Sequence, residues 1–162
     1  FSAQAVARSL RGLDAATVPP AHFARGHYFT VSGVSPFRHL IYPLPSRDGL
    51  GIHVALDLGG NLRFGPDVTF SPAPSYVFDE SRAAYFYQAI RSYYPGLPDG
   101  ALQPGFVGVR PKLAPEGRGF VDFVVQGPEQ HGVAGLLNLY GIDSPGLTSC
   151  LALAEEVASR SP

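Results

Sequence analysis

Two cationic side chains stand two positions apart in the stretch GVRPKL, residues 108–113. Alternate side chains of a strand share a face, so Arg110 and Lys112 would point to the same side of a sheet. Arginine offers a planar fork that matches a carboxylate, and lysine adds a point charge. The pair could therefore hold an acidic ligand, although a solvent-facing strand gives the same pattern. Pro111 places the stretch near a strand end or a sheet edge.

A histidine stands among small residues in GLGIHVALDL, residues 49–58. Alternation puts His53 opposite an apolar row formed by Ile52, Val54, Leu56 and Leu58. An imidazole in that position could line a pocket and move a proton. The spacing also fits an exposed histidine with no catalytic task. The other histidines lack the spacing of metal ligands, so we predict no metal site.

The stretch GIDSPGLTSCLALAEEV, residues 141–157, predicts the start of a final helix. Ser144 suits the N-cap and Pro145 the first helical position. Gly146 in the first turn lowers helix stability relative to alanine, which suggests that a ligand comes close to the backbone there. Unpaired amides at a helix start attract anions and electron-rich carbonyls. The amides that would meet the ligand are those of Gly146, Leu147 and Thr148. We expect the first half of this helix to be buried; a capped core helix without a ligand is the alternative.

The remaining pattern predicts an α+β fold with a mixed, largely antiparallel sheet and flanking helices. The sequence has 19 glycines and 16 prolines among 162 residues, which favours many turns and short strands. We expect helices at 2–11, at 79–96 and after Ser144. We expect strands at 27–33, 39–45, 106–113, 120–127 and 132–141, with a hairpin at 51–70 that turns at Gly-Gly.

Composition excludes several classes of function. A net charge of −1 argues against nucleic-acid binding, and no apolar stretch approaches the roughly 20 residues of a membrane span. The single cysteine, Cys150, excludes an internal disulfide and fits a reducing compartment. We therefore predict a cytoplasmic location, with peripheral attachment at the inner face of a membrane as a variant of it. The chain begins at Phe1 rather than Met, which suggests a fragment or a processed product.

Taken together, these stretches resemble a flavoprotein family. LIYPLP, GLGIHVALDLGGNLRFGPD, GVRPKL and NLYGIDSPGLTSCLALAEEV follow one another as in the C-terminal half of the FAD-dependent oxidoreductases of the D-amino-acid oxidase type. RGHYF (25–29) and GPD (65–67) point to the L-2-hydroxyglutarate dehydrogenase-like branch. Each motif is weak alone, but the set covers nearly the whole chain.

The resemblance implies FAD as cofactor and hydride transfer from the α-carbon of a small 2-hydroxy acid to flavin. In that comparison Arg110 grips the substrate carboxylate, Lys112 stands beside it as a companion, and His53 acts as base near the flavin. A C-terminal FAD-facing segment would run along the pyrimidine end of the flavin. Its residues are Gly141, Ile142, Ser144, Pro145, Gly146, Leu147 and Thr148.

One departure from the family is large, because the chain has no glycine-rich dinucleotide fingerprint after a strand. We therefore expect a substrate-domain-like region at 13–125. Segments 1–12 and 126–162 would complete an FAD-binding domain whose N-terminal half is a missing partner. Alone, the chain should bind FAD poorly and be inactive. An amino-acid or amine oxidase of the same family and a non-catalytic ligand-binding module are the alternatives.

Overall fold

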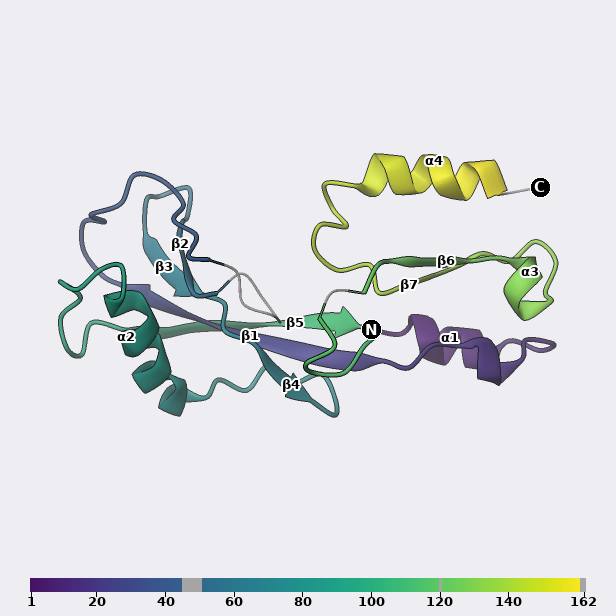
Figure 1. The fold of residues 1–162 in the computed structure, drawn as a ribbon, viewed down its shortest axis with the longest axis horizontal. Helices are drawn as coiled ribbons and strands as arrows, with labels where there is room; N and C mark the ends of the chain where they lie inside the picture. Colours follow the sequence, from purple (N-terminus) through teal and green to yellow (C-terminus); the bar gives the residue numbers. More distant parts are fainter. Residues whose placement is uncertain (45–50, 120, 161–162) are drawn as a thin grey trace. The chain divides into compact units, whose positions relative to one another are not determined.

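The computed structural model describes residues 1–44, 51–119 and 121–160, with four α-helices and seven strands in these ranges (Figure 1). The chain forms two compact units, one of residues 1–23 with 110–162 and one of residues 24–109. Each unit is described by itself below. Among the described residues, no helix is both long and apolar enough to cross a membrane.

The unit of residues 24–109 is built on an antiparallel sheet. Its strands run in the order β2-β3-β1-β4, and β5 pairs with β1. The bounds are β1 His22–Val31, β2 His53–Leu56, β3 Leu62–Gly65, β4 Thr69–Ser71 and β5 Gln103–Lys112. β1 and β5 each continue a few residues into the other unit. The predicted α+β class with an antiparallel sheet is confirmed.

One face of this sheet is covered by α2, Ala83–Arg91 (Figure 1). Phe86 and Ile90 point inward from the helix and join buried residues of the strands, including Phe29, Val54 and Phe64. A short 3-10 turn, Glu80–Arg82, leads into α2, and the carboxylate of Asp79 caps it by accepting from the Ser81 amide. The predicted helix at 79–96 is confirmed but ends at Arg91.

The hairpin expected at 51–70 is present, with Val54 paired to Phe64 and His53 paired to Gly65. Its turn is held by the carboxylate of Asp57, which accepts hydrogen bonds from the Gly59 and Asn61 amides and from Asn61 Nδ2, each at 2.8 Å. Ile52 and Val54 are buried as the alternation predicts. Leu58 does not belong to that apolar row, because it lies in the turn and is fully exposed.

The other unit holds a two-stranded antiparallel ribbon with a helix on each side (Figure 1). Its elements are α1 Ala3–Ser9, a 3-10 turn Ala15–Thr17, β6 Val124–Gln126, α3 Pro128–His131, β7 Asn138–Tyr140 and α4 Cys150–Arg160. Tyr140, Ala7 and Val18 form its buried core. At the far end of α4, Arg160 Nη1 donates to the Val125 carbonyl at 3.0 Å.

Three strand predictions need correction. The strand expected at 120–127 forms only over β6, Val124–Gln126, and position 120 lies outside the described residues. Residues 39–44 form no strand and contribute one bridge, Ile41 to Val54, while position 45 lies outside the described residues. Pro43 lacks the amide that a ladder needs. The strand expected at 132–141 shrinks to β7, because the positive φ angles of Gly132 and Gly135 turn the backbone before it.

Candidate active site

Arg110 and Lys112 both lie at the end of β5, and they have different surroundings. Lys112 Nζ is 2.7 Å from Asp143 Oδ2. Arg110 is partly buried, and no hydrogen bond or ion pair of its guanidinium is found among the described residues. The two cations lie two positions apart on one strand, and of these two only Lys112 faces a carboxylate within the described residues.

The final helix begins later than the sequence predicts. α4 starts at Cys150, so Ser144 is not its N-cap and Pro145 is not its first residue. Residues 144–149 form turns in which the Ser149 amide donates to the Pro145 carbonyl at 3.1 Å. The hydroxyls of Thr148 and Ser149 bond to the same carbonyl. Serine and threonine hydroxyls compete in this way for carbonyls near helix ends.

Gly146 is required by the loop itself. A Cβ at this position would lie 2.6 Å from the Asp143 carbonyl oxygen and 2.7 Å from Ile142 Cγ2. The Gly146 amide donates to that same Asp143 oxygen at 2.5 Å. Of the three amides expected to meet a ligand, this one is therefore occupied. Those of Leu147 and Thr148 have no hydrogen bond within the described part of the chain.

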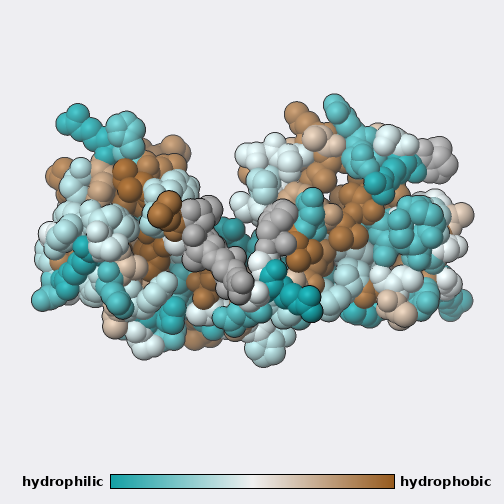
Figure 2. Space-filling model, in the orientation of Figure 1, coloured by the Kyte–Doolittle hydropathy of each residue, from teal (hydrophilic) through white to brown (hydrophobic). Residues whose placement is uncertain are grey.

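An open groove of about 340 Å³ lies beneath the first half of α4. It is lined by Asp122, Phe123, Pro145, Ser149, Ala152 and Leu153. Figure 2 shows apolar atoms exposed in this region. The first half of α4 is therefore not buried as predicted: Leu151 is 78% exposed, and no residue of the helix is buried. A groove lined largely by apolar side chains and one aromatic ring suits a planar ligand such as a flavin.

His53 lies on β2 and is 9% exposed, so the alternative of an exposed histidine is wrong. Its ring stacks on Tyr42 with 4.4 Å between centroids, and Nδ1 is 3.4 Å from the Gly51 carbonyl. The preceding carbonyl, that of Ile52, accepts from the Tyr93 hydroxyl at 2.9 Å. Burial raises the pKa of Tyr93 to about 12, so this hydroxyl keeps its proton and the bond at neutral pH. The backbone around His53 is thus held by a side chain from the turn that follows α2.

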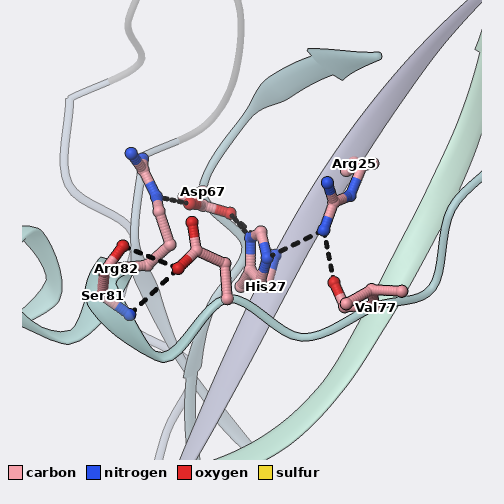
Figure 3. Close-up of polar contacts among 7 residues, drawn as sticks. Arg25, His27, Asp67, Val77, Ser81 and Arg82 are labelled. Atoms are coloured by element: carbon pink, nitrogen blue, oxygen red, sulfur yellow. Dashed lines mark hydrogen bonds and ion pairs between the residues drawn. The ribbon is translucent and has the colours of Figure 1, made fainter. Parts of the chain in front are cut away.

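The sequence reasoning missed a buried polar network behind this hairpin (Figure 3). Asp67 Oδ1 accepts from the His27 amide at 2.7 Å and lies 3.0 Å from His27 Nδ1. Asp67 Oδ2 accepts from Arg82 Nε at 2.7 Å. Arg25 Nη2 is 3.4 Å from His27 Nε2 and also donates to the Val77 carbonyl. Arg25 and His27 stand in RGHYF and Asp67 stands in GPD, but the spacing of these stretches does not show that they meet.

The network gathers polar groups around one buried carboxylate. Asp67 lies between His27 and Arg82, and the Arg82 guanidinium balances its negative charge. Gly65 completes the arrangement, because its φ of +141° and the 2.5 Å that would separate a Cβ from the His27 carbonyl both demand glycine. Gly65 is the cross-strand partner of His53, so the network supports the strand pair that carries His53.

The face of the sheet away from α2 carries a second feature that sequence reasoning missed. Tyr28 stacks on Phe106 with 4.4 Å between ring centroids. The guanidinium carbon of Arg63 lies 5.6 Å from the centre of the Phe106 ring. Arg63 alternates with the buried Leu62 and Phe64, so its side chain points away from the core. The strand residues therefore present aromatic rings and a cation on this face.

Comparison with known proteins shows the family to which the chain belongs. Residues 2–160 match the DAO family, described as FAD dependent oxidoreductase. The chain is 50% identical to L-2-hydroxyglutarate dehydrogenase, mitochondrial, of Arabidopsis thaliana over 172 aligned positions, which cover 99% of this chain and 36% of the relative. It is 27% identical to a glycerol 3-phosphate dehydrogenase of Caloramator mitchellensis over 80% of this chain and 26% of that protein.

A solved structure agrees with the fold. The dithionite-reduced L-alpha-glycerophosphate oxidase of Mycoplasma pneumoniae with FAD bound superposes with a TM-score of 0.75 at 20% identity. The match covers 97% of this chain and 39% of the oxidase, so the chain spans roughly a third of the proteins it resembles. The match over nearly every residue and the half-identical relative establish that the chain belongs to the DAO family of FAD-dependent oxidoreductases.

Proposed function

We propose that this chain is the C-terminal, substrate-binding portion of an FAD-dependent dehydrogenase that oxidises a small 2-hydroxy acid resembling L-2-hydroxyglutarate. The observation that carries the proposal is the 50% identity to the Arabidopsis L-2-hydroxyglutarate dehydrogenase over 99% of the chain. Arg110 agrees with it, because no carboxylate among the described residues neutralises its guanidinium, and an acidic substrate needs such a cation.

Arg110 is the residue we assign to the substrate carboxylate. A guanidinium binds a carboxylate through two parallel hydrogen bonds, which sets orientation as well as affinity. His53 is the proposed base, and its imidazole would take the proton of the substrate hydroxyl. The stacked Tyr42 ring and the Tyr93 bond to the Ile52 carbonyl would keep the imidazole in place. FAD, when bound, would supply the acceptor for the hydride of the substrate α-carbon.

The loop of residues 141–148, called the Gly141–Thr148 loop from here on, is the proposed contact for the flavin. The Leu147 and Thr148 amides supply donors, and the groove beside Pro145 and Phe123 supplies apolar wall. Backbone donors placed where negative charge develops stabilise it without reorganisation. The other cofactor-binding residues proposed from the sequence, including Gly141 and Ile142, keep that assignment as part of this loop. The N-terminal portion of the family fold is the proposed partner for the rest of the cofactor.

A spectroscopic titration tests the function. The gene product that contains this chain would be purified with FAD and mixed anaerobically with L-2-hydroxyglutarate while flavin absorbance is recorded. We expect bleaching by this acid, and none by glycerol 3-phosphate or by L-glutamate. A flavin that glycerol 3-phosphate alone reduces, or a gene product without flavin, would contradict the proposal. The cytoplasmic location predicted above stays a prediction, and the Arabidopsis relative is named as mitochondrial.

A further inference from the structure

The ion pair between Lys112 and Asp143 joins the end of β5 to the middle of the Gly141–Thr148 loop. The Lys112 ammonium lies 2.7 Å from Asp143 Oδ2, and the Asp143 side chain is only 9% exposed. A carboxylate that is largely withdrawn from water needs a cation to offset its lost hydration. Within the described residues, Lys112 is the one cation placed within ion-pair distance of Asp143.

Asp143 also organises the loop through its backbone. Its amide donates to the Gly141 carbonyl at 2.9 Å, and its carbonyl accepts from the Gly146 amide at 2.5 Å. The side chain that Lys112 holds therefore belongs to the residue around which the loop turns. A shift of Asp143 would move Gly146 and the two free amides that follow it, those of Leu147 and Thr148.

A second contact ties the same two segments together. A Cβ on Gly141 would lie 2.7 Å from Leu113 Cγ, and its φ is +68°, so the loop begins packed directly against Leu113. Consecutive residues of the chain, Lys112 and Leu113, thus hold the loop by charge and by packing. They follow Arg110 by two and three positions.

We propose that Lys112 is a positioning residue, which sets the Gly141–Thr148 loop for the flavin through Asp143, and that Arg110 alone of the two cations takes the substrate carboxylate. The proposal rests on the proposed function in taking this loop as the flavin contact. Its reason is competition: a substrate anion that approached Lys112 would have to displace a protein carboxylate already 2.7 Å away. Arg110 has no such competitor among the described residues.

The test compares Lys112→Gln, Asp143→Asn and the double variant in the gene product that contains this chain. Three quantities are measured: the FAD dissociation constant of the apoprotein, KM for L-2-hydroxyglutarate at saturating FAD, and hydrogen–deuterium exchange over residues 141–149. We expect each single variant to weaken FAD binding by roughly tenfold and to speed exchange in the loop, with KM changed less than about twofold. The double variant should be no worse than either single one, because both remove the same contact.

Two controls separate charge from position. Lys112→Arg keeps a cation and should restore most of the FAD affinity, and Arg118→Gln removes an exposed cation and should leave all three quantities unchanged. A Lys112→Gln protein with a raised KM and unaltered FAD affinity and exchange would overturn the proposal. If the wild-type gene product binds no FAD, the proposed function fails. The exchange measurement on residues 141–149 then still decides whether Lys112 positions the loop. In that case too, a Lys112→Gln protein with unchanged exchange over these residues would overturn the positioning role.

Discussion

His27 Nδ1 lies 3.0 Å from Asp67 Oδ1, and both side chains are buried, with 1% and 0% exposed. Arg82 closes the other side of the same carboxylate. The pair connects β1 to the segment that follows β3, so two stretches 40 residues apart are held at one point. Because β3 is the partner of β2, this contact is part of what fixes His53.

Asp67→Asn should destabilise the protein strongly. The change removes the charge that balances the partly exposed Arg82 and puts an NH2 donor where a buried oxygen had accepted hydrogen bonds. Breaking a buried pair of this kind costs about 3–5 kcal/mol. Chemical unfolding of the gene product, followed by circular dichroism, measures the difference.

The matched control for that experiment is Asp99→Asn. Asp99 pairs with Arg91, but its side chain is 94% exposed. Exposed pairs contribute about 0–1 kcal/mol, so this variant should unfold almost as the wild type does. Equal losses of unfolding free energy in the two variants would mean that the burial of Asp67 does not increase the contribution of its ion pair to stability.

The hairpin and α2 were predictable because short-range pattern decides them. Alternation through Ile52 and Val54 and a Gly-Gly turn are local signals, and both appear in the structure. The partners of His27 were not predictable in the same way. Asp67 and Arg82 lie far along the chain, and nothing in the spacing says that they meet.

The start of the last helix shows that a good local pattern can also mislead. Ser144, Pro145 and Gly146 form a good helix-start pattern, yet α4 begins at Cys150. The hydroxyls of Thr148 and Ser149 compete for the Pro145 carbonyl, and Asp143 is drawn to Lys112 on a distant strand. The candidate site residues stay a prediction from the sequence, and the ion pair between Lys112 and Asp143 could not be read from the spacing of either residue.

Arg110→Ala should raise KM for the acidic substrate and lower kcat/KM. Losing a charged contact that pairs with a buried carboxylate costs roughly 2–5 kcal/mol of transition-state stabilisation. Arg110→Lys should recover only part of this loss, because a point charge does not replace a planar fork. Steady-state kinetics at saturating FAD measure all three proteins. Unchanged kcat/KM in the alanine variant would remove Arg110 from the substrate site.

Gly65→Ala tests the close packing of the hairpin on β1. The added Cβ would lie 2.5 Å from the His27 carbonyl oxygen, at a φ of +141°. Backbone strain at such a position costs about 1–3 kcal/mol, and the clash adds to it. Gly60→Ala is the control, because Gly60 also has a positive φ of +79° but nothing within 4 Å of the new atom. Thermal unfolding should show a clearly larger loss for Gly65→Ala, and equal losses would contradict the close approach.

Asp57→Asn should reduce the acid sensitivity of the hairpin turn. Hydrogen bonds from the Asn61 side chain and amide, with one from Gly59, lower the pKa of the Asp57 carboxyl below its ordinary value of 3.8. A carboxyl whose pKa is lower in the folded state stabilises fully above its unfolded pKa, and this contribution is lost as pH falls through the folded pKa. The wild type should therefore lose more unfolding free energy than Asp57→Asn between about pH 6 and about pH 2.5. Asn61→Ala removes the largest cause of the lowered pKa and should flatten the same pH profile. Parallel profiles for all three proteins, measured by denaturant unfolding, would show that the turn carboxylate does not couple folding to pH.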